Sequence, residues 1–395
     1  MNFLKESKEF KLEALIEENT LNLDINEFLE VALRNNSKRE FLFIAKLLGK
    51  HLACKPERMQ ELGKLLVSAY LKKCDISLGK GATIIAFAET ATALGHSFFE
   101  AFCEDSEFIH TTREELDGIK RMEFIEEHSH AVNHYLYYDN LKSFKENDTV
   151  ILIDDEFTTG KTCLNIINTI NKIYPKKRFI LISILNWINP LEIKKFESLN
   201  CSIQFVYLFK GNFHFLKYKS IAEKNIVINE KCNYKNIDIK HIKLNFGEYI
   251  GSKKYIKYTG RFGMDKANQK ELNNIVEREI LKLEPVKKKI LVLGTEEFMY
   301  IPMLFAKKIK GDVSYHSTTR SPIIAFEDSK YPIKNKREIT SYFNDGIKNY
   351  IYNVNDTDYE EVFVFLEIDK PFDYSEIIGL FSNSLVKRLN IVHCS

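Results

Sequence analysis

The chain has 395 residues, of which 45% are hydrophobic, so it is long enough for two or three domains with cores of their own. Its 57 Lys and Arg residues almost balance its 55 Asp and Glu residues, and the formal net charge is +2. This balance excludes a general attraction to polyanions, and we expect no nucleic acid among the partners.

The first residues, MNFLKESKEFKLEAL, are charged throughout and lack the apolar region of a signal peptide. No stretch approaches the roughly 18 apolar residues of a membrane-spanning helix. The seven cysteines are scattered without a CxxC pair, which indicates reduced, mostly structural thiols. We therefore expect a cytoplasmic protein with no membrane partner.

The N-terminal part is expected to open with residues 7 to 34 as a helix plus an extended segment. Phe41 to Ala45 predicts a short strand, and residues 57 to 73 predict an amphipathic helix. Between these two elements stand basic residues around a glycine: Lys46, Gly49, Lys50 and His51. They suit an anion contact, and a solvated surface loop is the alternative.

A second strand, Thr83 to Ala88, is followed by Glu89 and Thr90 and by a small-residue helix over residues 91 to 102. A third strand, Glu107 to His110, leads into a polar segment that extends to Tyr138. In that segment His128, His130 and His134 suggest zinc, but their H-x-H-x3-H spacing is no recognised closed site and no Cys lies near. Proton transfer or a pyrophosphate contact is the preferred interpretation.

The most specific motif is ILIDDEFTTGKT, residues 151 to 162. Val150 to Ile153 predicts a buried strand that ends in Asp154 and Asp155, and a helix is expected from Cys163 to Ile173. Free N–H groups and the dipole at a helix N-terminus make the turn between them, Thr158 to Thr162, a phosphate site. The acids would repel a phosphate, so they suit hydroxyl groups or the water of a bound cation.

Further apolar strands are expected at Arg178 to Asn186 and Ser202 to Phe209. Strands and helices alternate along this part of the chain, which predicts an α/β fold with a parallel doubly wound sheet. The candidate ligand residues fall at the carboxyl ends of strands, where open α/β sheets bind their ligands.

The motif resembles the PRPP-binding signature of type I phosphoribosyltransferases, which is four apolar residues, two acids, two variable residues and Thr-Thr-Gly-x-Thr. In that family the acids, here Asp154 and Asp155, hold the ribose hydroxyls. The loop, here Thr158, Thr159, Gly160, Lys161 and Thr162, holds the 5′-phosphate. Glu156 departs from the pattern, where the family usually has a small or apolar residue. This third acid either tunes the metal or substrate or faces solvent.

The resemblance implies the rest of the site. The turn of Ala88, Glu89 and Thr90 would cradle pyrophosphate through its backbone, with Glu89 as a metal or water partner. Mg²⁺ would bind near Asp154 and Asp155, mostly through water. The polar segment corresponds to the mobile loop that closes over PRPP. Candidate contacts of the leaving group are Arg113, Lys120, Arg121 and His128. A hood that selects the acceptor would hold Lys46, Lys50 and His51.

Several segments together resemble a narrower group, the bacterial orotate-phosphoribosyltransferase-like proteins of tellurite-resistance gene neighbourhoods, which carry a C-terminal TRSP domain. The segments are NNSKREFLFIAKLLGKH, IAFAETATALGH, HTTRE, EEHSHAVNH and IDDEFTTGKT, then YTGRFG, LVLGTEEFMYIPM, YHSTTRSPI and NYIYNV. The resemblance covers roughly residues 30 to 370. It implies a phosphoribosyltransferase domain with an N-terminal hood over residues 1–228, a connecting region over 229–285 and a smaller α/β domain over 286–395.

The last third of the chain is similar to the first. ILVLGTEEF at 290–298 matches TIIAFAETA at 83–91, and Glu296 and Arg320 both lie 207 residues after Glu89 and Arg113. VFVFLEI at 362–368 matches the strand that begins at Val150 but lacks the Thr-Thr-Gly-x-Thr loop. We expect a degenerate repeat with strands at 290–294 and 362–366 in one sheet, and convergence is the alternative.

The repeat retains Thr318, Thr319 and Arg320, which suit a phosphate or carboxylate because Arg offers a two-pronged fork. In the connecting region, Lys253, Lys254, Arg261 and Gly263 are placed to reach an anionic ligand across a cleft between the domains.

The predicted function is that of a Mg²⁺-dependent phosphoribosyltransferase, which uses PRPP and a base-like acceptor to make a nucleotide-like metabolite and releases pyrophosphate. One alternative is a catalytically inactive regulator that binds PRPP or a nucleotide. Another is a bifunctional enzyme whose C-terminal domain processes the product. The acceptor is not identified by the sequence, and whether the chain forms a homodimer stays open.

Overall fold

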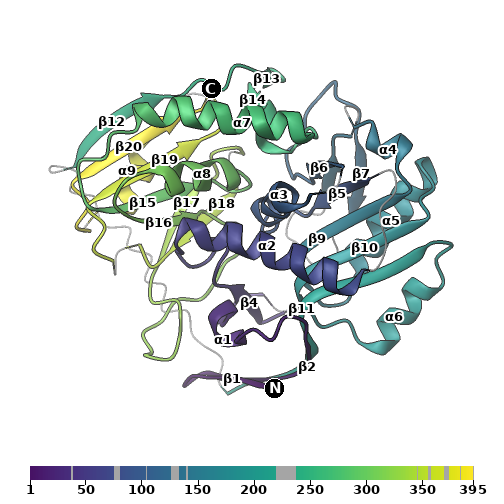
Figure 1. The fold of residues 1–395 in the computed structure, drawn as a ribbon. Coiled ribbons are helices and arrows are strands. Elements are labelled where there is room, and N and C mark those ends of the chain that lie inside the picture. The colour runs from purple at the N-terminus through teal and green to yellow at the C-terminus, as the bar shows by residue number, and fades with distance from the viewer. Residues whose placement is uncertain are drawn as a thin grey trace.

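The computed structural model describes residues 1–36, 39–74, 81–103, 105–125, 133–138, 141–218, 237–344, 346–354, 357–368, 373–382 and 384–394. It consists of two α/β units that lie side by side, each built on its own mainly parallel sheet (Figure 1). We refer to them as the first unit and the second unit in chain order.

The first unit contains a seven-stranded sheet with the order β1-β2-β11-β10-β9-β5-β6. Its strands are β1 (Asn2–Glu6), β2 (Phe10–Asn19), β5 (Ala82–Ala86), β6 (Ser106–His110), β9 (Thr149–Phe157), β10 (Arg178–Asn186) and β11 (Ser202–Lys217). The five strands from β11 to β6 are parallel, and β1 and β2 add an antiparallel edge. The predicted parallel sheet is therefore confirmed.

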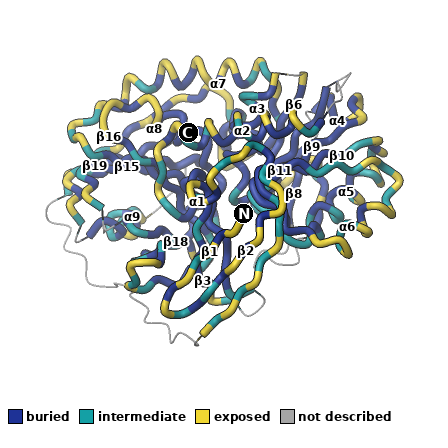
Figure 2. The backbone as a smooth tube through the Cα atoms, turned by 60° about the horizontal axis from the view of Figure 1, so that its bottom comes forward, coloured by how far each residue is buried: buried dark blue, intermediate teal, exposed yellow. Residues whose placement is uncertain are grey.

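Helices cover both faces of this sheet, and successive residues of one strand point to opposite helices. Ile151 and Ile153 of β9 share a core with α2 (Pro56–Lys73) and α3 (Thr92–Ala101). Leu152 shares another with α5 (Lys161–Ile173) and α6 (Pro190–Glu197). A strand buried on both faces needs apolar residues throughout, which is why ILI in the motif is continuous. Figure 2 shows the central strands buried and the outer surfaces of the helices exposed.

Smaller elements complete the first unit. They are α1 (Ile25–Phe28), α4 (Ser143–Glu146) and two antiparallel strand pairs, β3 (Leu29–Leu33) with β4 (Phe41–Ala45) and β7 (Met122–Ile125) with β8 (Asn133–Leu136). Residues 7 to 34, expected as a helix plus an extended segment, contain both, but the helix α1 has only four residues and most of the segment is extended, as β2 and β3. Phe10, Leu12, Ala14 and Ile16 are buried at every second position, and that period of two is typical of a strand.

The second unit contains a five-stranded parallel sheet with the order β12-β20-β19-β15-β16. Its strands are β12 (Asp238–Lys243), β15 (Lys289–Gly294), β16 (Asp312–Ser317), β19 (Glu361–Leu366) and β20 (Arg388–His393). Around it lie α7 (Lys266–Glu279), α8 (Tyr300–Lys308), α9 (Ser375–Leu380), the pair β13 (Tyr249–Ile250) and β14 (Tyr255–Ile256), and the pair β17 (Lys336–Thr340) and β18 (Lys348–Tyr352). Because β15 pairs with β19, the expectation that both segments lie in one sheet is confirmed.

The expected limits of the connecting region differ from the structure. Within 229–285, β12 forms the edge of the second sheet and α7 packs on the second core. The sequence of β12, DIKHIK, gave no strand signal because this edge strand is mostly exposed and carries charged side chains. The second unit therefore includes residues from Asp238 onward.

Four adjacent strands have the same order in the two sheets, which supports the repeat. Strands β10-β9-β5-β6 correspond to β20-β19-β15-β16, and in each unit an antiparallel pair follows the outer strand. Thr111 N donates to the carbonyl of Ala86, and Thr318 N donates to that of Gly294, so these two strand ends correspond. The strand registers then place Glu367 at the position of Asp155.

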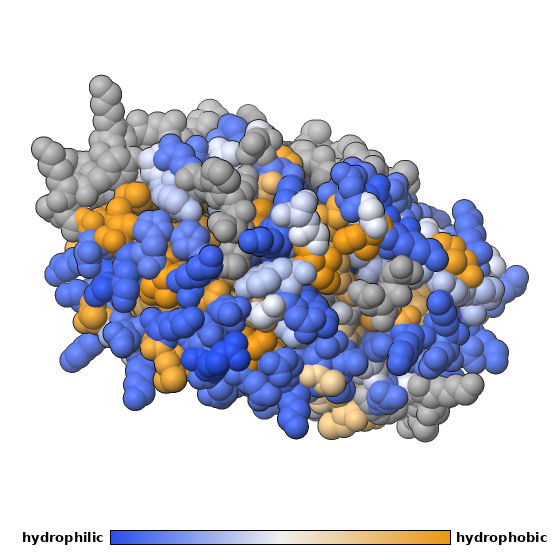
Figure 3. Space-filling model, turned by 90° about the horizontal axis from the view of Figure 1, so that it is seen from above, coloured by the Kyte–Doolittle hydropathy of each residue, from blue (hydrophilic) through white to orange (hydrophobic). Residues whose placement is uncertain are grey.

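Among the described residues, no helix is both long and apolar enough to cross a bilayer. On the face in Figure 3, hydrophilic side chains cover most of the described area and the hydrophobic ones form small separate patches. The described cysteines, which exclude Cys232, are all free.

Candidate active site

A cavity of about 770 Å³ opens at the carboxyl ends of the parallel strands of the first sheet. The first unit lines it with the Asp154–Cys163 segment, with the turn after β5 and with the β3–β4 pair. The second unit lines it with Arg320–Pro322 and with Ile347, Lys348 and Tyr350 of the β17–β18 pair. The cavity is thus shared by both units.

The acids Asp154 and Asp155 line this cavity and are half-buried. They belong to β9 rather than following it, because β9 continues to Phe157 beside β10. Asp155 N donates to Asp154 Oδ1 at 2.9 Å. Burial and the neighbouring charge of Glu156 raise the pKa of Asp155 to about 6.

Glu156 is engaged by an arginine that the sequence analysis did not single out. Arg39 Nη1 and Nη2 donate to the two Glu156 oxygens at 2.5 and 3.1 Å, and the guanidinium lies over the ring of Phe41, 5.1 Å from its centroid. Such a two-pronged pair holds both partners in a defined orientation. It connects the β3–β4 pair to the end of β9 and neutralises the third acid.

The loop from Thr158 to Thr162 lines the cavity and leads into α5, which begins at Lys161. Gly160 is the N-cap residue, with φ of 69° and no side-chain cap, so the first turn presents backbone N–H groups at the cavity. Packing also requires glycine here, because a Cβ at Gly160 would lie 2.6 Å from Cζ of the buried Phe196.

The turn after β5 contains Ala88, Glu89 and Thr90, and all three line the cavity. The Ala88–Glu89 peptide bond is cis, and Ala88 N donates to Thr111 Oγ1 at 2.8 Å. The Glu89 carboxylate is 5% exposed and forms ion pairs with Lys50 and, at 3.3 Å, with Arg113. Burial opposes its charge, but Lys50, Arg113 and Arg320 hold the pKa of Glu89 below its ordinary value.

The hood residues occupy different places. His51 lines the cavity, and burial followed by the charge of Lys50 lowers its pKa to about 3, so it is neutral. Lys50 is buried and its Nζ donates to the Glu296 carbonyl at 2.6 Å besides pairing with Glu89. Lys46 donates to the Asn26 carbonyl at 2.9 Å. Of the three, only His51 belongs to the described cavity lining.

The expected leaving-group contacts also divide. Arg113 lines the cavity, whereas Lys120 lies over the Tyr138 ring and Arg121 pairs with Glu115 and Glu123. His128 and His130 lie outside the described residues. His134 is described and buried, and its Nδ1 lies 3.4 Å from Thr111 Oγ1.

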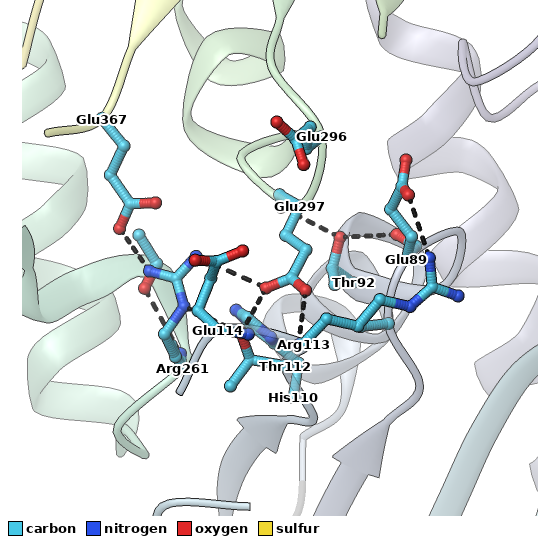
Figure 4. Close-up of polar contacts among 12 residues, drawn as sticks. Glu89, Thr92, His110, Thr112, Arg113, Glu114, Arg261, Glu296, Glu297 and Glu367 are labelled. Atoms are coloured by element: carbon cyan, nitrogen blue, oxygen red, sulfur yellow. Dashed lines mark hydrogen bonds and ion pairs between the residues drawn. The ribbon is translucent and has the colours of Figure 1, made fainter. Parts of the chain in front are cut away.

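A buried polar cluster joins the two units behind the cavity (Figure 4). Glu297 accepts from Thr112 Oγ1 at 2.6 Å and from Arg113 N at 2.8 Å. Arg261, expected to reach an anionic ligand, is instead fully buried; its Nη1 donates to Glu367 Oε1 at 2.5 Å and its Nη2 pairs with Glu297 at 3.5 Å. Glu367 corresponds to Asp155, which lines the cavity of the first unit. Arg261 therefore occupies the place beside Glu367 that corresponds to the cavity beside Asp155.

Sequence reasoning missed three features of the cavity: Arg34 and Arg39, the rings of Phe41, Phe43 and Phe213, and the whole contribution of the second unit. The Thr-Thr-Arg motif at 318–320 signalled an anion contact. It gave no sign that Arg320 lines the cavity of the first unit.

Comparisons with known proteins agree with this division into two units. A family model described as phosphoribosyl transferase matches residues 28–212, and one described as the TRSP domain, C-terminal to PRTase_2, matches residues 258–383. No curated protein matches the chain.

Similar solved structures cover about half of the chain. Adenine phosphoribosyltransferase from Trypanosoma brucei is 15% identical, with 49% of this chain and 82% of that chain covered and a TM-score of 0.35. The enzyme from Giardia lamblia is 13% identical, with coverages of 47% and 96% and a TM-score of 0.34. Orotate phosphoribosyltransferase from Mycobacterium tuberculosis H37Rv is 11% identical, with coverages of 45% and 89% and a TM-score of 0.28.

Proposed function

We propose that this chain, which belongs to the phosphoribosyl transferases with a C-terminal TRSP domain, transfers the 5-phosphoribosyl group of PRPP to a base-like acceptor and releases pyrophosphate. One observation carries the proposal. The two acids of β9, the Thr158–Thr162 loop and the Ala88–Thr90 turn all line the same cavity. These are the groups that a ribose, a 5′-phosphate and a diphosphate need in one place.

The loop would bind the 5′-phosphate. The first turn of α5 offers N–H groups and the positive end of the helix dipole, and Thr158, Thr159 and Thr162 line the cavity beside it. An anion bound here gains charge-assisted hydrogen bonds. Little conformational entropy is lost on binding, because the backbone at Gly160 already holds the loop in its turn conformation.

The acids would hold the ribose. Departure of pyrophosphate leaves positive charge at the anomeric carbon, and a carboxylate placed nearby stabilises that charge. Asp155, with a pKa of about 6, is mostly ionised at pH 7 and above. Because Arg39 already neutralises Glu156, the charge available to the sugar comes from Asp154 and Asp155.

Asp154 and Asp155 would hold Mg²⁺, mostly through water, and the ion would supply positive charge that neutralises the diphosphate. The residues fit this role, because Asp154 and Asp155 are acidic, half-buried and line the cavity. No three His, Cys, Asp or Glu side chains of the described residues converge into a metal cage. Proteins often bind Mg²⁺ through one or two carboxylates, with substrate phosphates and water supplying the remaining ligands.

The acceptor would enter beside the β3–β4 pair. Phe41, Phe43 and Phe213 line the cavity there with apolar rings. Arg34 and Lys348 line it with basic side chains, and Lys348 also pairs with Glu338 at 2.7 Å. Planar rings stack on such faces. A planar heterocyclic acceptor with an electron-rich edge suits this end of the cavity.

The test is release of pyrophosphate from PRPP and Mg²⁺ by the full chain, assayed against a panel of purines, pyrimidines and ring carboxylates. We expect release that depends on one class of acceptor. The Lys195→Gln variant, altered at an exposed pair with Glu192, is the matched control and should behave as the unchanged chain. Tight binding of PRPP without turnover for any acceptor would favour the regulator instead.

A further inference from the structure

The second unit contributes an arginine to the cavity of the first. Arg320 lines the cavity together with Arg113, and the repeat relates the two residues. In each unit the preceding threonine pairs with the second strand of the antiparallel pair, Thr112 with Tyr135 and Thr319 with Tyr350. The two arginines thus stand at corresponding places, although a single cavity receives both.

Both arginines meet at the turn expected to hold pyrophosphate. Glu89 Oε2 lies 3.3 Å from Arg113 Nη1 and accepts from Arg320 N at 3.4 Å. In the opposite direction, Glu297 of the second unit accepts from Arg113 N. A carboxylate of each unit therefore accepts a hydrogen bond from the backbone of the other unit's arginine turn.

The side chain of Arg320 is held in place on one edge. Nε and Nη2 donate to Glu296 Oε2 at 2.8 and 2.6 Å, and Nη2 also donates to Glu114 Oε1 at 3.1 Å. Ser341 Oγ donates to the other oxygen of Glu296 at 2.6 Å. Nη1 of Arg320 forms no hydrogen bond with any described residue, and the side chain is 11% exposed.

We propose that Arg320 contacts the diphosphate group of PRPP opposite Arg113, so that the second unit completes the active site of the first. The inference rests on the proposed function. Arg is suited to this place because its fork binds two phosphate oxygens at once and stays charged when partly buried. In the second unit the position beside Glu367 is occupied by Arg261, whose Nη1 donates to Glu367 Oε1.

Glu296 acts as a positioning residue in this arrangement. It fixes the plane of the guanidinium without lining the cavity itself. Glu114 assists from the first unit, and Asn344 Nδ2 donates to the same Glu114 oxygen at 2.6 Å. The anionic partner of Arg320 Nη1 is thus left to the ligand.

The test compares Arg320→Gln and Arg320→Lys with Arg278→Gln, which removes a mainly exposed arginine of α7 from the same unit. We expect Arg320→Gln to raise the KM for PRPP and the inhibition constant of pyrophosphate about tenfold or more, with the acceptor KM unchanged. Arg320→Lys should show a smaller rise in the same two constants, because it retains the charge but loses the fork. Arg278→Gln should change none of them.

Equal PRPP and pyrophosphate constants in a folded Arg320→Gln would overturn the inference. If that variant does not fold, as judged by thermal unfolding, Arg320→Lys decides: unchanged constants overturn the inference and raised ones support it. Absence of PRPP binding in the unchanged chain is a separate result, which would overturn the proposed function itself.

Discussion

The guanidinium of Arg39 forms two hydrogen bonds with the carboxylate of Glu156, at 2.5 and 3.1 Å. Arg39 balances most of the negative charge of Glu156, the residue next to Asp155. Glu156 still contributes to the raised pKa of Asp155. Besides burial, two residues that are 117 positions apart in the sequence, Arg39 and Glu156, therefore influence the pKa of Asp155.

Removal of the Arg39 charge and removal of the Glu156 charge should move the pKa of Asp155 in opposite directions. Glu156→Gln deletes a negative neighbour and should lower it, whereas Arg39→Gln deletes a positive one and should raise it. If turnover requires ionised Asp155, the acidic limb of the pH profile of kcat/KM, near pH 6, shifts down in the first variant and up in the second. Limbs that coincide in both variants would show that Asp155 does not control turnover.

Gly160 should be needed for stability as well as for binding. Its φ of 69° disfavours other residues, and a Cβ would collide with Phe196. Gly160→Ala should lower the free energy of unfolding by about 2 kcal/mol or more. The control is Gly247→Ala, where φ is 79° and no atom lies within 4 Å of the added Cβ. If urea unfolding shows the same decrease in the free energy of unfolding for both variants, the added Cβ at Gly160 does not collide with Phe196.

Glu114 should make the folded protein less stable as the pH rises. Burial, together with Glu297 and Glu296, raises its pKa to about 7, against 4.5 for an ordinary Glu. Between these values the folded chain binds the proton more strongly than the unfolded one, so the contribution of this group to stability falls with increasing pH.

Glu114→Gln should remove this pH-dependent contribution, because an amide does not titrate. Its oxygen can still accept the hydrogen bonds from Arg320 and Asn344. Relative to the unchanged chain, the variant should gain stability from pH 5 to pH 8, by on the order of 1–3 kcal/mol. Urea unfolding at the two pH values measures it. A constant difference across this range would mean that Glu114 is ionised throughout.

The elements that the sequence predicted best are those with a local signal. β10 spans the predicted Arg178–Asn186, and α2 and α5 begin within two residues of their expected starts, because apolar runs and helical periods lie within one segment. β11 was expected to end at Phe209 but continues to Lys217, since its last residues alternate in burial against β2 rather than form an apolar run.

The parts that could not be predicted depend on contacts between distant segments. Nothing near Arg39 indicates Glu156, and nothing near Arg320 indicates Glu89, 231 residues away. The Thr-Thr-Arg repeat drew attention to both arginines, and both line the cavity; their contact with an anion stays a prediction. Only the packing of one unit against the other brings them to the same carboxylate.

We propose that the cavity between the units binds PRPP through Asp154, Asp155 and the Thr158–Thr162 loop. Calorimetric titration of PRPP with Mg²⁺ into the full chain and into the Asp154→Asn, Asp155→Asn double variant measures this binding. Both acids are half-buried at a strand end, so the variant should keep its melting temperature within a few degrees while losing turnover and binding PRPP at least tenfold more weakly. Equal PRPP affinity in a folded double variant, or no heat of binding in the unchanged chain, would contradict binding of PRPP at these acids.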